Sequence, residues 1–429
     1  MPPTPRSARA PVEFRFGRMR RLLKGGPVRT VSVDGVAAEF VTDPELVRRI
    51  LVKDGKHYGK GELFQKARIL SKAGLLADDD ALHRHYRRLA HPYVRTAAAV
   101  DHAPGMEKIA RDAVAAWRPG QPVDVQATMC RAASGIPLST LFDGLPGDTE
   151  SVLVEQLTVL AREMIGKPLH GRAALQRGPA RRLASAFTGF RSLLAGCLAD
   201  RPDATAGYLS ALLSDAERTG TPALSTDEIC DEAVMMLIAA TVTTASVMSW
   251  ALYVLAEHPQ IEEYVLKDLA RTAGGCPAAP SGHGHGHGPP GYTLRFLAEV
   301  LRLYPPVWIT CRKALSSVTL DDRTLPAGTH VMFSSYLLHR DPDRYPDPHR
   351  FDPDRWLTAS PNAQDASYIP FGAGARGCVG EPFAWKELET LLGAVTREWQ
   401  LTVPPGTRIR PAAHTTLHPQ RLLMTPQPR

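Results

Sequence analysis

The sequence predicts a mainly α-helical fold with a small β-rich portion. Apolar residues recur at helical spacing along much of its 429 residues, most clearly in the stretches 225–257 and 381–399. Several more helices, separated by Pro and Gly, are expected between residues 97 and 200. Strands are expected near the N-terminus, where apolar residues alternate at 28–33 and 37–41. Helices therefore dominate the expected core.

The N-terminal elements follow from short patterns. Residues 1–26 form a basic tail without an apolar run long enough for a signal peptide or a membrane span. After the two strands, the run Asp43-Pro44-Glu45-Leu46 opens a helix, because Asp is a good N-cap and Pro suits the first turn. Because residues 1–26 contain no such apolar run, we expect no membrane attachment.

The longest helix is expected to start at a capping box. The Ser225 side chain can accept a hydrogen bond from the backbone N–H of Glu228, whose carboxylate can accept one in return. At about 1.5 Å per residue, the helix to about Glu257 would be about 45 Å long and could cross the molecule. It contains Ala239-Ala240-Thr241-Val242-Thr243-Thr244. Threonines in such a helix can bond carbonyls of their own helix, and this structural role is one interpretation.

The composition restricts the possible partners and the compartment. A formal net charge of +7 is compatible with nucleic-acid binding, but no basic stripe with interleaved aromatic residues is present, so we expect an acidic protein partner and no nucleic acid. The six cysteines lack the spacing of disulfide pairs or zinc fingers. This usage indicates a reducing compartment, the cytoplasm.

Residues 273–292 are rich in Gly, Pro and His and predict a flexible surface loop. Three alternate histidines within it, at 283, 285 and 287, could bind a divalent metal. Without a fixed scaffold such a site would be weak.

The stretch Phe371–Gly380, F-G-A-G-A-R-G-C-V-G, holds Cys378 between glycines just before the helix 381–399. A thiolate that binds a metal must be deprotonated, and a helix N-terminus and a nearby cation such as Arg376 both lower a cysteine pKa. The glycines let the backbone turn tightly and approach a flat partner. We expect Cys378 to be a metal ligand, and a buried structural cysteine in a turn is the alternative.

These ten residues resemble the haem-binding signature of cytochrome P450s, and the resemblance extends in register over about residues 74–400. It implies a single P450 domain over residues 1–429, of the soluble, bacterial (actinomycete-like) type. It also implies heme b (iron protoporphyrin IX) as the cofactor, with Cys378 as its axial ligand and with Phe371 and Gly372 in the binding loop.

The same resemblance implies where the haem propionates are held. His83 and Arg87 lie four residues apart on one expected helix face, so both can reach one anionic group. Arg312, in T-C-R-K-A, matches the family's arginine for the second propionate, and Arg376 is a further candidate. A solvated basic helix and an ordinary surface arginine are the respective alternatives.

Residues 239–244 resemble the family's oxygen-activation segment, in which a threonine hydroxyl takes part in catalysis. Thr243 matches that threonine, and we expect Thr244 to hold a water beside the substrate. The acidic residue that normally precedes the threonine is absent, because position 242 is valine. Protons must then arrive by another path, which we expect to run through Thr243 and ordered water.

A third family motif is structural. Glu299 and Arg302 match the E-x-x-R pair, and Arg355 lies in a later motif whose arginine joins that pair. An isolated surface pair at this spacing would contribute only a few tenths of a kcal/mol, so the third member gives the motif its meaning. The run His339-Arg340-Asp341-Pro342 is another landmark in the expected order.

The resemblance implies a monooxygenase that uses dioxygen and electrons from an acidic, ferredoxin-type donor to oxidise a hydrophobic small molecule in secondary metabolism, and that acts as a cytoplasmic monomer. The apolar segment 306–310 suits a terpenoid or a polyketide. Oxidative coupling, cyclisation or desaturation without oxygen insertion is one alternative. A non-catalytic haem-thiolate sensor or carrier is another.

Overall fold

A computed structural model describes residues 8–9, 26–33, 36–61, 75, 80–142, 147–166, 179–199, 207–215, 224–273, 290–358 and 367–429. Most of the basic tail 1–26 and of the Gly- and His-rich loop 273–292 lies outside these described residues, as do the three alternate histidines.

Helices make up most of the described chain, as the sequence predicts. In chain order they are α1 (Pro44–Arg48), α3 (Asp80–Val94), α4 (Thr96–Val114), α5 (Val125–Leu141), α6 (Gly147–Gly166), α8 (Pro179–Ala199), α9 (Gly207–Leu213), α11 (Thr226–Glu257), α12 (Pro259–Ala273), α13 (Tyr292–Leu303), α14 (Ser335–Leu338) and α15 (Glu381–Glu398). Short helical turns follow α1 and precede α15: η2 (Arg49–Lys53), η3 (Gly55–His57), η4 (Pro353–Leu357) and η5 (Gly374–Arg376).

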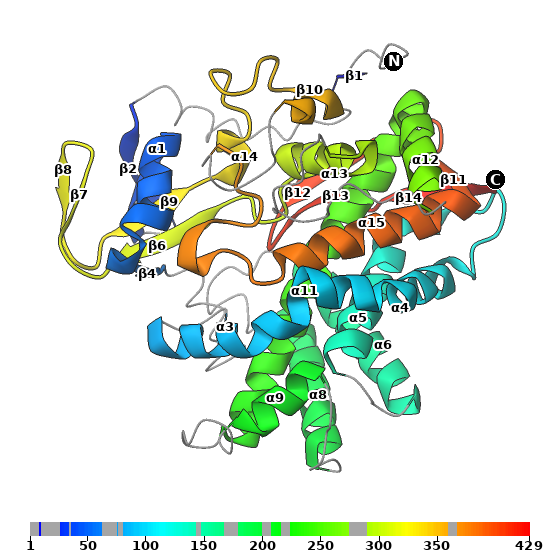
Figure 1. The fold of residues 1–429 in the computed structure, drawn as a ribbon, viewed down its shortest axis with the longest axis horizontal. Coiled ribbons are helices and arrows are strands. Elements are labelled where there is room, and N and C mark those ends of the chain that lie inside the picture. Colours follow the sequence, from blue (N-terminus) through cyan, green and yellow to red (C-terminus); the bar gives the residue numbers. More distant parts are fainter. Residues whose placement is uncertain are drawn as a thin grey trace.

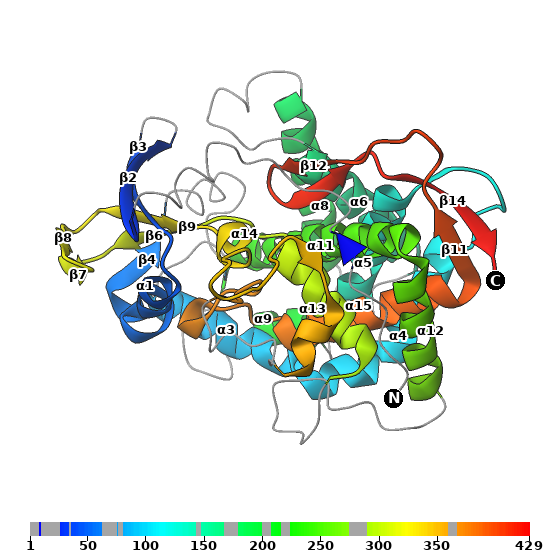
Figure 2. The ribbon, with the colours of Figure 1, turned by 90° about the horizontal axis from the view of Figure 1, so that it is seen from above.

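The strands form one larger sheet and several small ones. The five-stranded sheet has the order β2 (Val28–Val33), β3 (Val36–Val41), β9 (His330–Phe333), β6 (Thr310–Ala314) and β4 (Tyr58–Lys60), with only the β3–β9 pair of these parallel. Smaller sheets contain β11 (Trp399–Thr402), β14 (Leu423–Pro428) and β5 (Val123–Asp124); β12 (Arg410–Ala413) and β13 (Leu417–Gln420); β7 (Val318–Leu320) and β8 (Arg323–Leu325); and β1 (Ala8–Arg9) and β10 (Arg350–Phe351). Figures 1 and 2 show the five-stranded sheet and α1 at one side of the helical mass.

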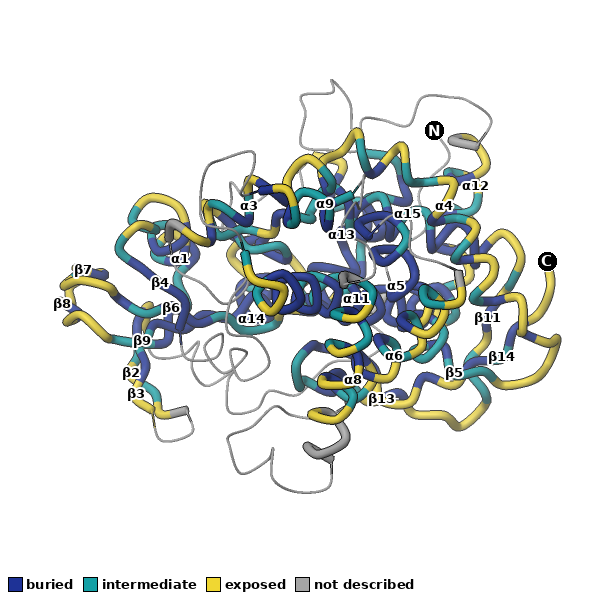
Figure 3. Tube along the Cα trace, turned by 90° about the horizontal axis from the view of Figure 1, so that it is seen from below, coloured by how far each residue is buried: buried dark blue, intermediate teal, exposed yellow. Residues whose placement is uncertain are grey.

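Helix α11 runs through the centre of the molecule (Figure 3). The predicted capping box is present: the Glu228 N–H donates to Ser225 Oγ at 3.2 Å, and the Ser225 N–H donates to Glu228 Oε2 at 2.9 Å. By length and composition α11 could cross a membrane, but 78% of its most apolar window is buried inside the fold. Its apolar sequence is therefore explained by packing against α5, α6, α8 and α15.

A second, smaller core lies under the five-stranded sheet. Val41, Val331 and Phe333 of the sheet pack there with Leu51 of η2 and with Ile369 and Ala373, which precede Cys378. The residues before Cys378 are thus built into the β-rich portion, whereas α15, which follows it, belongs to the main helical core.

Candidate active site

The loop around Cys378 needs glycine at two positions. Gly372 and Gly374 have φ angles of +71° and +69°, a region that other residues rarely adopt. A Cβ at Gly374 would also collide with the carbonyl oxygen of Leu51 in η2. Two backbone hydrogen bonds shape the turn, from Gly372 N to Ile369 O at 3.1 Å and from Cys378 N to Phe371 O at 2.8 Å. The glycines of the motif therefore let the loop press against η2 and present Cys378 just before α15.

The thiol of Cys378 does not have the lowered pKa that the sequence led us to expect. Protein around the sulfur raises its pKa to about 11 through burial, and the charge of Glu381 adds to this, whereas the N–H of Gly380 and the charge of Arg87 lower it. The residue is nevertheless exposed, so it is open on one side. Burial outweighs the helix terminus here, and the cation that acts on the sulfur is Arg87 on α3. A metal at the open side would supply the missing charge, because a coordinating thiol is deprotonated outright.

Five basic side chains from four elements converge beside this loop. His83 and Arg87 come from α3, Arg312 from β6 and Arg376 from η5. The sequence did not point to the fifth, Lys60, which lies on β4 in register with Arg312 of β6. His83, Lys60 and Arg312 are buried. Predicted site residues that are far apart in the sequence are thus brought together.

These basic groups repel one another. Burial lowers the pKa of His83 to about 3, with further lowering from Arg376, Lys60, Arg87 and Arg84. Burial and the charge of Arg376 lower the pKa of Arg312 to about 10. Among the described residues, Arg87 donates to the carbonyl of Gly377 at 2.6 Å and Arg312 to that of Cys311 at 3.1 Å, rather than to carboxylates. Such a cluster suits a ligand that brings its own negative charges.

A cavity of about 260 Å³ adjoins the cluster. Arg312 and Arg376 line it together with Tyr58, Lys53 and Lys56. Its wall continues the positive charge of the cluster, so an anionic group there would also be favoured.

The threonines of α11 point in three different directions. Thr241 donates to the carbonyl of Ala133 in α5 at 3.1 Å, and Thr243 donates to the carbonyl of Ala239 in its own helix at 2.8 Å. Thr244 is buried and donates to Glu387 Oε2 of α15 at 3.0 Å. This differs from the expectation that Thr244 holds a water beside the substrate. The reason is geometric, since consecutive residues on a helix are about 100° apart.

Glu387 is a candidate that the sequence reasoning missed. The residue is 1% exposed, and its Oε1 has no hydrogen-bond partner among the described residues. Burial raises the pKa of Glu387 to about 8, although the bond from Thr244 lowers it. The sequence does contain one signal for it. Glu387 lies four residues after Phe383, which places an acidic residue on the apolar face of the expected helix.

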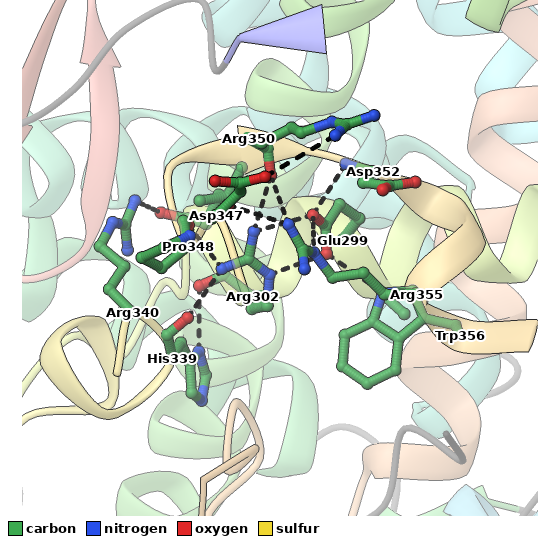
Figure 4. A network of polar contacts seen from close by, with 12 residues as sticks. Glu299, Arg302, His339, Arg340, Asp347, Pro348, Arg350, Asp352, Arg355 and Trp356 are labelled. Atoms are coloured by element: carbon green, nitrogen blue, oxygen red, sulfur yellow. Dashed lines mark hydrogen bonds and ion pairs between the residues drawn. The ribbon is translucent and has the colours of Figure 1, made fainter. Parts of the chain in front are cut away.

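Glu299, Arg302 and Arg355 form the network that the motif predicts (Figure 4). Arg302 donates to both carboxylate oxygens of Glu299 at 2.8 Å, and Arg355 donates to Oε1 at 3.2 Å. Trp356 Nε1 and the backbone N–H of Asp352 complete the shell of Glu299 at 3.2 and 2.9 Å. The Glu299 and Arg302 side chains are fully buried.

Comparison with known proteins agrees with this architecture. The model of the family Cytochrome P450 matches residues 198–429. Cyclooctatin synthase of Streptomyces melanosporofaciens is 32% identical over 398 residues, covering 90% of this chain and 85% of the relative. Cyclooctat-9-en-7-ol 5-monooxygenase of the same organism is 29% identical (94% and 87% covered), and pentalenene oxygenase of Streptomyces avermitilis is also 29% identical (96% and 92% covered).

Solved structures share the fold. The retinoic acid-bound cyanobacterial CYP120A1 superposes with a TM-score of 0.81 at 21% identity, covering 97% of this chain and 94% of that one. A six-coordinated cytochrome P450 from Thermus thermophilus gives a TM-score of 0.73 at 23% identity, with 96% and 98% covered. The chain belongs to the cytochrome P450 family, is of the bacterial actinomycete type, and is a haem-dependent monooxygenase that uses dioxygen, a hydrophobic substrate and a redox partner.

Proposed function

We propose that this enzyme binds heme b through Cys378 and inserts one oxygen atom into a cyclic terpene hydrocarbon or alcohol. The observation that carries the cofactor proposal is the cluster of His83, Arg87, Arg312 and Arg376 beside an open cysteine sulfur. The printed names of the relatives support the substrate class.

The residues present fit such a haem. Cys378 Sγ would ligate the metal, with the Gly380 N–H directed at the sulfur. The four basic residues and Lys60 would hold the two propionates, whose negative charges would relieve the repulsion within the cluster. Bound haem supplies the oxygen and electron chemistry, which a thiolate ligand promotes.

Proton supply is the step in which this chain departs from the family pattern. We propose that Glu387 holds a proton at neutral pH, that Thr244 Oγ1 fixes its Oε2, and that Oε1 is the atom from which the proton leaves. Thr243, one residue earlier on α11, would pass protons on through water. Glu387 and the two threonines thus take the place of the acidic residue that the family normally has at the position of Val242.

We propose that the electron donor docks on a basic face of the enzyme. Arg84, Arg88 and His91 are exposed on α3, the helix that also carries Arg87, and Arg95 is exposed directly after it. This basic face supports docking of an acidic, ferredoxin-type donor. We further propose that the chain acts as one P450 domain, as a monomer, in the cytoplasm.

The experiment that tests the function uses purified enzyme with a reductase, a ferredoxin and NAD(P)H. Cyclic terpene hydrocarbons and alcohols are screened for shifts in the haem spectrum, and the products of those that bind are weighed by mass spectrometry. A product heavier by one oxygen atom supports the proposal. A product lighter by hydrogen would indicate coupling or desaturation instead, and binding without turnover with any donor would indicate a sensor or carrier.

Replacing Arg87 or Arg312 with alanine is expected to accelerate haem loss about ten- to a hundredfold. Each change removes a charged hydrogen bond to a propionate, with a contribution of about 1.5 to 3 kcal/mol. Transfer of haem to an acceptor protein measures the rate. Arg84→Ala is the matched control, because Arg84 is exposed on the same helix as Arg87. Equal rates in all three variants would contradict the propionate roles.

Thr243→Ala is expected to consume NAD(P)H with less product, because the hydroxyl that passes protons is lost. Thr241→Ala is the control, since Thr241 bonds Ala133 of α5. The measurement is product formed per NAD(P)H consumed. A fully coupled Thr243→Ala enzyme would exclude the proposed path.

Glu387→Gln is expected to make the protein more stable than wild type as the pH rises. The carboxyl pKa is about 8 in the fold, against 4.5 ordinarily. Between these values the unfolded chain has released a proton that the folded chain keeps, so wild-type stability falls by up to about 1.4 kcal/mol per pH unit. The glutamine variant has no carboxyl to titrate at this position, so its stability does not fall in this way. Urea unfolding across this window measures the difference, and a constant difference at every pH would show that Glu387 is not a buried protonated acid.

A further inference from the structure

His339 follows α14 directly and is fully buried. Its Nδ1 lies 3.1 Å from the carbonyl oxygen of Arg302 in α13, and its Nε2 lies 2.9 Å from the backbone nitrogen of Ile369. A backbone carbonyl only accepts and a backbone N–H only donates, so these partners assign a neutral ring with its proton on Nδ1. One side chain therefore joins two distant chain segments.

The surroundings keep this ring neutral. Burial lowers the pKa of His339 to about 3, and the charges of Arg302 and Arg340 act in the same direction, whereas hydrogen bonds to the carbonyls of Arg302 and Leu301 raise it. The ring also stacks on Tyr368, with the centroids 5.3 Å apart. Its orientation is fixed by packing as well as by hydrogen bonds.

On one side His339 belongs to the network of Glu299. The carbonyl of Arg302 accepts a hydrogen bond from the Nδ1–H of His339, and Arg302 Nη1 donates one to the carbonyl of His339 at 2.8 Å. The same guanidinium binds Glu299 (Figure 4). His339 and Arg302 thus form a reciprocal pair at the end of α13.

On the other side His339 holds the start of the cysteine loop. The ring accepts a hydrogen bond from the N–H of Ile369. The carbonyl of Ile369 in turn accepts one from the N–H of Gly372 at 3.1 Å. Two residues further on, the carbonyl of Phe371 accepts a hydrogen bond from the N–H of Cys378 at 2.8 Å. Three backbone N–H groups are thus held in sequence along the ten residues from Ile369 to the ligand.

We propose that His339 is a positioning residue for Cys378, which transmits the fixed orientation of α13 and Glu299 to the loop and so places the sulfur for thiolate ligation. This role rests on the proposed haem binding. It connects the Glu299 network to the loop of the metal ligand through Arg302, His339 and Ile369.

The test compares His339→Phe with His418→Phe. His418 is also a buried neutral histidine, with Nδ1 2.9 Å from the carbonyl of Thr416 and a pKa lowered by burial to about 4, but it lies on β13. His339→Phe is expected to lose most of the red-shifted band of the reduced carbon monoxide complex that marks thiolate ligation, whereas His418→Phe keeps it. Loss of the band in equal proportion in both variants would overturn the proposal.

Amide hydrogen exchange gives a second measurement that does not depend on the haem spectrum. The Gly372 and Cys378 amides are expected to exchange about tenfold faster in His339→Phe than in His418→Phe. If His339→Phe does not fold, His339→Asn replaces it, because the shorter amide can still bond one of the two partners, and a smaller loss of the band is expected. Wild-type protein without a thiolate band would contradict the proposed function, whereas a normal wild type with unchanged variants would contradict only the role of His339.

Discussion

Cys378→Ser is expected to abolish thiolate ligation and, with it, monooxygenase activity. A serine hydroxyl stays protonated near neutral pH and is a poor ligand for iron. The cysteine thiol also has a raised pKa in the protein alone, about 11, so the metal itself has to stabilise the thiolate. The reduced carbon monoxide complex measures the change, because the red-shifted band requires thiolate. Its persistence in the variant would refute the ligand assignment.

Cys130→Ser is the control for this experiment. Cys130 is fully buried in α5, and burial raises its pKa to about 12, so it remains a thiol without a metal. Its replacement is expected to lower stability slightly and to leave the band intact. The contrast separates loss of the ligand from loss of any cysteine.

The sequence predicted the parts of the site that depend on local spacing. The loop of Cys378, the capping box of Ser225 and the buried network of Glu299 all follow from residue types at fixed separations. Each is confirmed. A tight glycine turn, a helix start and the i,i+3 pair of Glu299 and Arg302 are determined mainly by neighbouring residues, whereas distant Arg355 could be joined to that pair only through its motif. The helical fold with a small β-rich portion is confirmed for the same reason.

What the sequence could not predict depends on burial and on contacts across the fold. Lys60 joins the basic cluster only because β4 pairs with β6 in a register that places it opposite Arg312. Thr244 meets Glu387 only because α11 packs on α15. The pKa of Cys378 was predicted in the wrong direction because the cost of desolvation is invisible in a sequence.

Glu299→Gln is expected to destabilise the protein by about 3 to 5 kcal/mol. The change keeps the shape of the side chain but removes the charge that compensates Arg302, and both side chains are fully buried. Arg355 and Trp356 also lose an anionic acceptor. Urea unfolding of the haem-loaded enzyme measures the loss, and failure to obtain folded protein would represent an effect at least this large.

Glu263→Gln is the matched control. Lys267 bonds Glu263 at 2.6 Å, a distance as short as those around Glu299, but the two side chains are 66% and 62% exposed. Water solvates either partner alone, so this change is expected to lower stability far less than Glu299→Gln does. Similar losses of stability in the two variants would show that burial does not make the charges of the Glu299 network more costly to unpair than those of an exposed ion pair. A loss confined to Glu299→Gln, accompanied by a weaker thiolate band, would connect that network to the ligand loop, because Arg302 and His339 bond each other and His339 bonds Ile369.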